Sequence, residues 1–361
     1  MKIQQLGKEQ IILSNPYSLH KYFAWPTVCR LQNGKIAVTA SGYRLNHICP
    51  FGKTVISFSE DEGNSYTLPA PVIDTFLDDR DGGICPFGKS GVIVTSFNNT
   101  VAFQQKIAKT DSFTNYKLAY LNEVPKEQEE QQLGSTFRIS HDCGITFGEL
   151  KKSPITSPHG PTVLSDGTIL WVGNRFGGID ASKVCSNSLN AYYIAESGDM
   201  EFVGEIGDID ERVSYEPFAV EAADGTIICH IRVENRNSDE RIFTIYQSES
   251  CDKGKTWSCP HQLLGNTDGA PAHILKLSNG TLVSTYGVRS HPFGIKAMFS
   301  FDNGKTWDIN HTIYDNKGIS SDIGYPSTVE LENGQLLTVF YAKTTPGGAA
   351  VIMQQKWSFT K

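Results

Sequence analysis

The sequence predicts an all-β fold, a six-bladed β-propeller that spans residues 1–361 as one domain. Two internal repeats support this prediction: a hairpin motif of eight residues that occurs four times, and an Asp-Gly or Asn-Gly turn that recurs at a near-constant spacing. The composition agrees with it, because 33 glycines and an aromatic content of 11% suit many short strands joined by tight turns.

The eight-residue motif has the pattern Ser-x-Asp-x-Gly-x-Ser/Thr-aromatic. Its copies occupy residues 59–66, 140–147, 250–257 and 300–307. The Asp can accept hydrogen bonds from backbone N–H groups of its own turn, and the Gly supplies a residue with positive φ. The motif therefore predicts four tight hairpins, each with its aromatic residue packed beneath the turn.

The second repeat is a turn that precedes an apolar strand. Its glycines are Gly34, Gly91, Gly167, Gly225, Gly280 and Gly334, which are 57, 76, 58, 55 and 54 residues apart. Each interval holds the four strands of one propeller blade. The longest interval predicts a solvated insertion within Thr110 to Gln132, most charged over 126–132. The last repeat ends before a fourth strand, so a strand near residues 10–13 is expected to close the ring, with no helical domain and no linker.

Bulk properties exclude several classes of function. The net charge of −7 and the lack of a basic stretch argue against a nucleic-acid partner. No apolar run is long enough to span a membrane. The first residues lack an apolar signal core, which favours a cytoplasmic location. The eight cysteines form no CxxC pair or zinc-like cluster, so we expect reduced thiols and neither a metal nor another cofactor.

Candidate functional residues stand just before each turn, where the innermost strand of a blade is expected to begin. Propellers hold ligands at one end of the central channel, and these strand starts point there. The candidates are charged, aromatic or imidazole side chains: Trp25, Asp79, Arg80, Asp81, His159, Glu216, His273 and Tyr325. Such residues are rarely buried in a core unless they are paired. We expect them to contact a substrate, although some could instead join neighbouring blades.

The eight-residue motif resembles the Asp-box of the sialidase (neuraminidase) superfamily, and the chain resembles the bacterial exo-α-sialidases. In that family a Glu opens one blade and an Arg follows at the end of its next strand. A second Arg shortly precedes an Asp-box, and a Tyr opens the last blade. Glu216, Arg232, Arg289 and Tyr325 stand in these places. The resemblance implies that Tyr325 is the nucleophile and Glu216 its general base, while the two arginines hold a substrate carboxylate.

The chain departs from the family pattern at three places. Ala24 stands where the family has its first Arg, and Ala342 stands where that Arg has its partner Glu. His47 lies near the place of the family's acid/base Asp. We expect His47 to protonate the leaving group, because an imidazole titrates near neutral pH. Either Arg44 or Arg80 is expected to replace the missing positive charge.

Taken together, these patterns predict a sialidase-like exo-glycosidase that releases a terminal, anionic, sialic-acid-like sugar from a glycan. Two alternatives stay open. One is a lyase that acts on a uronate-type sugar through His47, His159 or His273 together with Tyr325. The other is a propeller that binds carbohydrate without catalysis. A carbohydrate is the partner in all three cases, and the sequence leaves the sugar, the linkage and the oligomeric state open.

Overall fold

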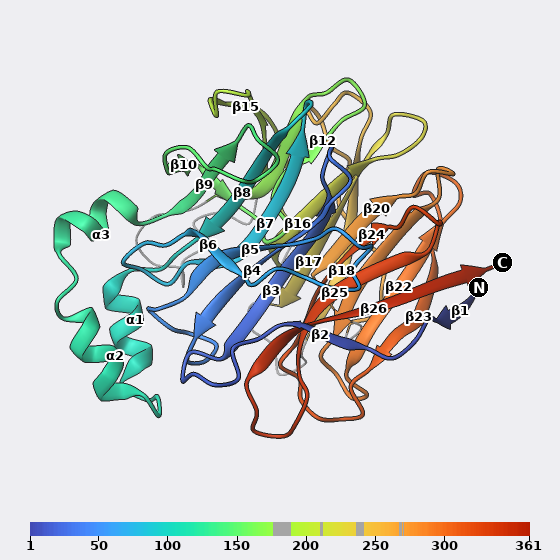
Figure 1. The fold of residues 1–361 in the computed structure, drawn as a ribbon. Coiled ribbons are helices and arrows are strands. Elements are labelled where there is room, and N and C mark those ends of the chain that lie inside the picture. Colours follow the sequence, from blue (N-terminus) through green and yellow to red (C-terminus); the bar gives the residue numbers. More distant parts are fainter. Residues whose placement is uncertain (176–188, 210–211, 236–241, 267–268, 270) are drawn as a thin grey trace.

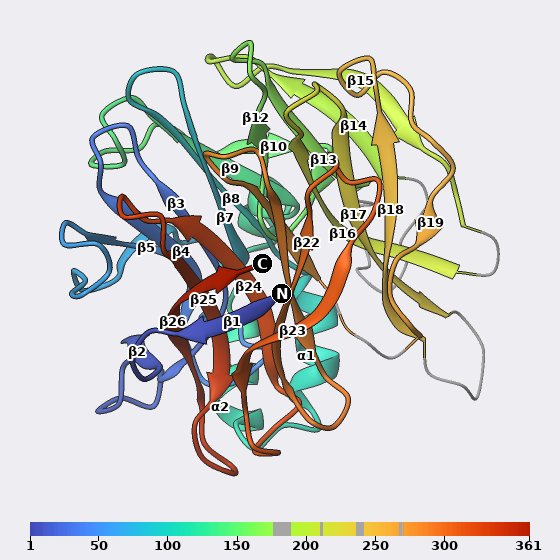
Figure 2. The ribbon, with the colours of Figure 1, turned by 90° about the vertical axis from the view of Figure 1, so that its right-hand side faces the viewer.

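The computed structural model shows six small sheets arranged around one axis, which confirms the six-bladed propeller (Figures 1 and 2). It describes residues 1–175, 189–209, 212–235, 242–266, 269 and 271–361. Within these ranges no helix is long and apolar enough to cross a membrane. All seven cysteines in these ranges are free thiols, and Cys185 lies outside the described residues.

Each blade is an antiparallel sheet whose strands follow the chain from the channel outward. The first blade consists of β3 (Tyr22–Arg30), β4 (Ile36–Arg44), β5 (Lys53–Ser59) and β6 (Ala70–Ile73). The second consists of β7 (Arg80–Phe87), β8 (Gly91–Phe97), β9 (Ser135–Ser140) and β10 (Lys151–Ser153). In the third, β11 (Ile155–Thr156) and β12 (Thr162–Val163) both pair with β13 (Ile169–Arg175), and β14 (Leu189–Ile194) and β15 (Met200–Ile206) follow.

The other three blades follow the same plan. The fourth consists of β16 (Arg212–Glu221), β17 (Ile227–Asn235), β18 (Phe243–Ser250) and β19 (His261–Gln262). The fifth consists of β20 (Ala272–Lys276), β21 (Leu282–Val288), β22 (Gly294–Ser300) and β23 (Asp308–Asp315). The sixth combines β24 (Ile323–Glu330), β25 (Leu336–Lys343) and β26 (Ala350–Thr360) with β1 (Lys2–Gln5) and β2 (Gln10–Leu13). The innermost strands contact one another around the ring, as β3 does with β7 and β24.

The sixth blade is closed by the N-terminal segment. The expected strand at Gln10–Leu13 is β2, which pairs with the inner half of β26, with Gln10 opposite Gln354. A second strand, β1, pairs with the end of β26, with Lys2 opposite Thr360. Both ends of the chain therefore lie in one sheet, side by side in Figures 1 and 2.

The hydrophobic core lies between neighbouring blades. Between the sixth and first blades, for example, Leu337 and Val339 pack with Val28 and Val38, all nearly inaccessible to solvent. This stacking follows from the alternation of side chains along each strand, which gives every inner sheet two apolar faces. The polar groups at the strand starts are left for the channel.

The insertion in the second blade differs from the expectation. It consists of three short helices between β8 and β9, namely α1 (Val101–Ala108), α2 (Thr114–Leu121) and α3 (Lys126–Gln132). It thus begins before Thr110 and is helical rather than irregular. The side-chain oxygen of Thr100 caps α1 by accepting from the N–H of Phe103 at 3.0 Å, a local signal for a helix start. The charged segment is α3, whose residues are not buried, as expected.

The four Asp-boxes form the same hairpin in four blades. In the last one, Asp302 Oδ1 accepts from the N–H of Thr306 at 2.9 Å, and Ser300 Oγ accepts from the N–H of Gly304 at 2.8 Å. Gly304 has φ 84°, the left-handed conformation that favours glycine. Trp307 donates to Gln247 of the preceding blade at 2.8 Å. Because these hairpins follow the third strand, they lie at the end of the propeller opposite to the strand starts.

Candidate active site

Four inner strands share a β-bulge at their start, and a fifth has a glycine with positive φ at the same place. The bulge residue has positive φ and precedes a proline or glycine; these residues are Trp25 (φ 54°), Asp81 (φ 51°), Gly160 (φ 76°), Glu216 (φ 47°) and Tyr325 (φ 50°). The strand register shifts at the four non-glycine positions. A non-glycine residue in this conformation costs about 1–2 kcal/mol. Strain repeated at one place in four blades points to a functional site there.

Two of these bulge residues meet across the channel. The hydroxyl of Tyr325 donates a hydrogen bond to Glu216 Oε1, and Arg232 Nη1 donates to Glu216 Oε2 at 2.6 Å. The backbone N–H of Glu216 donates to Asn174 Oδ1 at 3.0 Å, which holds the bulge in place. Burial, followed by the Glu216 carboxylate, raises the pKa of Tyr325 well above its usual value. The phenol is therefore protonated at neutral pH and already bonded to a base.

Two arginines converge beside this pair. The guanidinium carbons of Arg232 and Arg289 lie 4.8 and 5.7 Å from the ring centre of Phe243. Arg232 is paired with carboxylates of Glu216 and Glu234. Arg289 instead donates to Tyr341 Oη at 2.8 Å, and it forms no ion pair with any residue in the described ranges. Within the described residues, Arg289 therefore brings a positive charge that no carboxylate contacts directly.

A third cation comes from Arg80. Its guanidinium carbon lies 3.9 Å from the ring centre of Trp25, close enough for a cation–π contact. Its Nη1 donates to the backbone carbonyl of His47 at 2.8 Å and to Asp78 Oδ2 at 3.3 Å, while its Nε and Nη2 have no partner among the residues that the structure describes. Trp25 is itself next to Tyr325, with ring centres 6.4 Å apart. The bulge of the first blade thus places an aromatic ring between Arg80 and Tyr325.

Arg44 and Asp79 do not line the channel, which corrects two expectations. Arg44 is fully buried, with Nη1 2.6 Å from Asp78 Oδ1 and 2.7 Å from Ser41 Oγ. Asp79 is also fully buried and accepts from the N–H of Thr75 at 2.7 Å, so that it holds a local turn. Both side chains have their hydrogen bonds within the fold. Of the two candidates for the third cation, only Arg80 has donors to spare.

His47 lies at the rim of the channel, with 47% of its side chain exposed. Its Nδ1 is 3.0 Å from Tyr22 Oη and 3.4 Å from Asp322 Oδ1, and its ring contacts Trp25 edge-on at 5.0 Å. The partial burial of the ring lowers the pKa of His47, and the hydrogen bond to Asp322 opposes this effect. Since Asp322 and Tyr22 hold Nδ1, Nε2 is the nitrogen left for a ligand.

Two histidines lie deeper in the channel. The rings of His159 and His273 are 5.2 Å apart, and Phe218 stacks on His273 at 4.6 Å. Burial lowers the pKa of His159 to about 3 and that of His273 well below its usual value, so both rings are neutral. His159 is also near Tyr325, with ring centres 6.4 Å apart.

Buried polar atoms in the same region lack partners. Asp81 Oδ1 and His159 Nε2 are inaccessible and have no hydrogen bond within the described residues. Burial raises the pKa of Asp81 to about 7, and the Glu216 carboxylate adds to this effect. Buried polar groups are nearly always hydrogen-bonded in native proteins. These two atoms are therefore exceptions to the usual pairing, and both lie close to the Tyr325–Glu216 pair.

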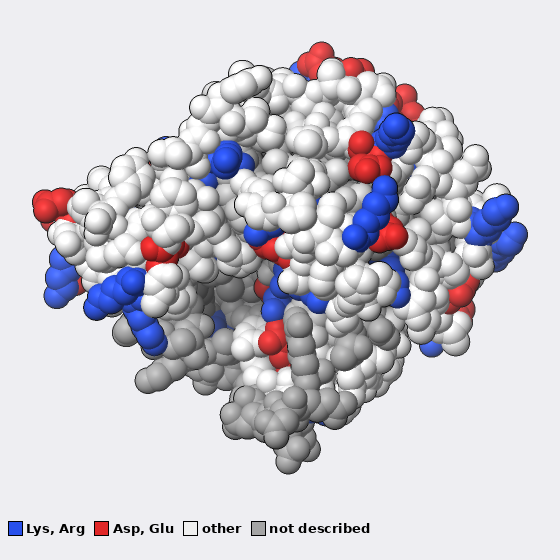
Figure 3. All heavy atoms as spheres, turned by 90° about the horizontal axis from the view of Figure 1, so that it is seen from below, with Lys and Arg blue, Asp and Glu red and all other residues white. Residues whose placement is uncertain are grey.

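Figure 3 looks onto the end of the molecule where the inner strands begin. It shows basic and acidic atoms side by side at a hollow in this face. No group of three or more metal-ligating side chains occurs in the described part of the chain. The mixture of guanidinium, carboxylate, phenol and imidazole groups suits an anionic polar ligand and proton transfer.

Four supporting residues were not singled out from the sequence. They are Tyr22, Asn174, Asp322 and Tyr341, which orient His47, Glu216 and Arg289. All four lie at the same end of the propeller as the bulges. Asp322 precedes Tyr325 by three residues, so the sequence did carry a positional signal for it. Asn174 and Tyr341 stand near the ends of second strands, where no turn motif marks a residue as facing the channel.

Comparison with known proteins identifies the family and the fold of the chain. A family profile described as a BNR repeat-like domain matches residues 94–338. The chain belongs to this family. A search of curated proteins finds no match.

This BNR propeller shares its fold with several solved structures. A Dyadobacter fermentans protein of unknown function superposes with a TM-score of 0.74 and 17% identity, covering 99% of both chains. The intramolecular trans-sialidase of Ruminococcus gnavus gives 0.66 at 12% identity, over 96% of this chain and 97% of that one. The Trypanosoma rangeli sialidase gives 0.63 at 15% identity, over 98% of this chain and 59% of that one. The fold is therefore that of a sialidase-like BNR propeller.

Proposed function

We propose that this protein is an exo-glycosidase that removes a terminal anionic sugar from a glycan. The observation that carries the proposal is the hydrogen bond from the Tyr325 hydroxyl to Glu216, in a channel that also holds Arg80, Arg232 and Arg289. The likeness in fold to the T. rangeli sialidase and the R. gnavus trans-sialidase supports the substrate class.

In the first step the Tyr325 oxygen forms a bond to the anomeric carbon. Glu216 accepts the phenolic proton, and protonated His47 gives its proton to the departing glycosidic oxygen. In the second step a water molecule transfers a proton to His47 and attacks the anomeric carbon. Tyr325 then leaves and recovers its proton from Glu216. Atoms balance as the hydrolysis of one glycosidic bond.

A phenol suits an anionic substrate because it is neutral as it approaches the sugar, whereas a carboxylate nucleophile would be repelled. Arg289 supplies a positive charge with no carboxylate partner in the described ranges, and Arg80 adds free N–H donors. Planar guanidinium groups bind a carboxylate through paired hydrogen bonds. We assign the substrate carboxylate to the side of the channel formed by Arg232 and Arg289.

The decisive experiment replaces Tyr325 by Phe and measures turnover of a panel of aryl glycosides that includes sialosides. Only one hydroxyl is lost, so we expect kcat to fall by about three orders of magnitude while binding is nearly unchanged. Tyr66→Phe is the matched control, since it removes a hydrogen-bonded phenolic hydroxyl from an Asp-box at the opposite end of the propeller. Full turnover in Tyr325→Phe on a proven substrate would contradict the mechanism.

A further inference from the structure

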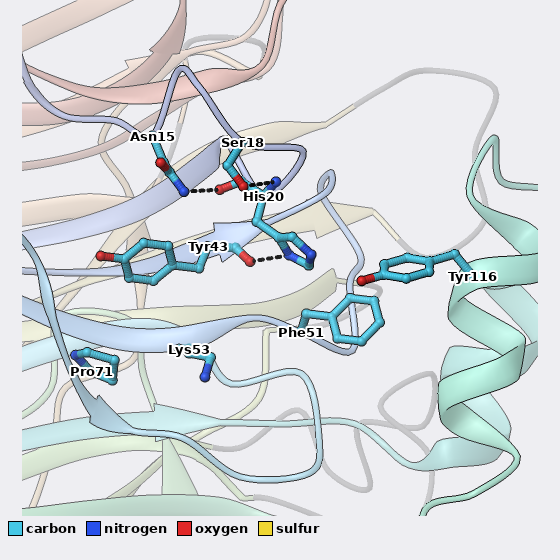
Figure 4. Close-up of a pocket in the computed structure, with 8 residues that line it drawn as sticks. All are labelled: Asn15, Ser18, His20, Tyr43, Phe51, Lys53, Pro71 and Tyr116. Atoms are coloured by element: carbon cyan, nitrogen blue, oxygen red, sulfur yellow. Dashed lines mark hydrogen bonds between the residues drawn. The ribbon is translucent and has the colours of Figure 1, made fainter.

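A second pocket lies beside the channel on the outer part of the first blade. It has a volume of about 500 Å³ (Figure 4). Its walls come from the first blade, helix α2 and the loop of residues 14–21 between β2 and β3, called the N-terminal loop below. A cavity of this size accommodates one or two sugar rings. None of the groups proposed to act on the substrate in the channel lines it.

The pocket opens at the same end of the propeller as the channel. Strand β4 ends at Arg44 and β5 begins at Lys53, so the loop between them lies at the end where the inner strands start. This loop carries His47 at the rim of the channel and Phe51 in the wall of the pocket. One short loop therefore separates the two cavities.

Aromatic rings form one side of the pocket. Phe51 lies 5.1 Å from the ring of Tyr116 and 5.2 Å from the ring of His20. Figure 4 shows Tyr116 reaching from its helix with the hydroxyl end toward His20 and Phe51. The Tyr116 residue is 52% exposed, so part of its surface stays open to a ligand. Exposed rings with a polar edge suit ligands that have both apolar faces and hydroxyl groups.

The polar groups of the pocket favour a neutral ligand. His20 Nδ1 is 2.9 Å from the backbone carbonyl of Tyr43, which can only accept, so Nδ1 carries a proton and Nε2 is an acceptor in the neutral imidazole. The Lys53 ammonium is 2.6 Å from Asp74, which offsets its charge. The pocket thus offers an acceptor and a neutralised donor next to the aromatic rings, which is the chemistry that binds hydroxyl groups.

We propose that this pocket binds a neutral saccharide unit of the glycan, the part of the substrate that lies beyond the anionic sugar held in the channel. The assignment rests on the proposed function for its place in a substrate, although the binding itself needs no turnover. It gives the helical insertion a role, because α2 supplies the Tyr116 ring that completes the pocket wall.

The insertion also connects the pocket to the loop between β4 and β5, which carries His47. Lys117 follows Tyr116 on α2, and its Nζ donates to Asn46 Oδ1 at 2.7 Å and to the Ile48 carbonyl at 2.6 Å. These two residues flank His47. A sugar seated against Tyr116 would therefore contact the helix that fixes the His47 loop, so that the longer glycan is held by the element that also positions the proton donor.

Binding of neutral disaccharides tests the proposal directly. Lactose, cellobiose and maltose are titrated into the full protein and followed by ligand-observed NMR. We expect at least one to bind, and Tyr116→Ala and Phe51→Ala to weaken that binding about tenfold. Tyr17→Ala is the control, because Tyr17 is a fully exposed aromatic residue of the same N-terminal loop outside the pocket wall.

The outcomes separate this proposal from the proposed function. Disaccharide binding that survives Tyr325→Phe and is lost in Tyr116→Ala supports the pocket even if no glycoside is hydrolysed. If turnover is found, kcat/KM for an oligosaccharide should fall in Tyr116→Ala, while that for an aryl glycoside of the same sugar stays unchanged. Absence of binding by all three disaccharides, or binding equal in Tyr116→Ala and the wild type, would overturn the assignment.

Discussion

The two ends of this propeller differ in what the blades have in common: side chains at one end, and only the backbone conformation at the other. At the Asp-box end, four blades carry the same side chains in the same hairpin, and each turn is held by its own Asp. At the channel end, the blades repeat the backbone of a bulge but not its side chain, which is Trp25, Asp81, Glu216 or Tyr325. One end repeats chemistry because it holds each blade together. The other repeats only geometry, so that each blade can contribute a different group.

The largest effect is expected on ligand affinity, when a cation at the channel end is removed and compared with a cation at the Asp-box end. Arg289→Ala removes a channel charge that has no carboxylate partner in the described ranges, and we expect it to weaken binding of an anionic sugar by about 2–5 kcal/mol. Lys305→Ala, at an exposed Asp-box position, should leave binding unchanged. Calorimetric titration of a sialoside into the Tyr325→Phe background measures both. Unchanged affinity in Arg289→Ala and also in Arg232→Ala would remove the anionic-substrate proposal.

A smaller effect should appear in the pH dependence of turnover. His47 must be protonated to act as an acid, and burial holds its pKa below the usual value, so kcat should rise as the pH falls through the acidic side of neutrality. Asp322→Asn removes the partner that stabilises the protonated ring, and the high-pH limb should move to still lower pH. Asp302→Asn, in an Asp-box, is the control. A limb that stays in place in Asp322→Asn would argue that another group supplies the proton.

The smallest effect is expected on the free energy of unfolding, which should change in opposite directions in a channel variant and an Asp-box variant. Asp81→Gly relieves a positive φ and removes a buried carboxyl whose Oδ1 is unpaired, so it should stabilise the fold by about 1 kcal/mol. Asp302→Ala removes hydrogen bonds to its own turn and should destabilise the fold by about 1 kcal/mol. Thermal unfolding of the two variants measures this. Destabilisation by Asp81→Gly would mean that the bulge side chain serves the fold and not the site.

The sequence predicted the features that repeat and missed those that depend on distant partners. The hairpins, the blade count and the strand starts follow from local patterns. Glu216 and Tyr325 were chosen because both open a blade, and their side chains are hydrogen-bonded to each other. Arg44 and Asp79 were misplaced because four consecutive polar residues at 78–81 do not reveal which of them faces the channel. The partner that buries Arg44 is Asp78, 34 positions away in the chain. The helical insertion was missed because its short helices carry no long apolar period.

The closure of the ring bears on how the protein is made. Lys2 pairs with Thr360, so the sixth sheet joins residues from nearly opposite ends of the chain. During synthesis the first five blades can assemble in order, but β1 and β2 must wait for β26 to leave the ribosome. Tyr325 stands on β24 of this last sheet, while Glu216 belongs to the fourth. Tyr325 therefore meets Glu216 only after β24 has joined the ring, so an incomplete chain would lack the hydrogen bond on which the proposed function rests.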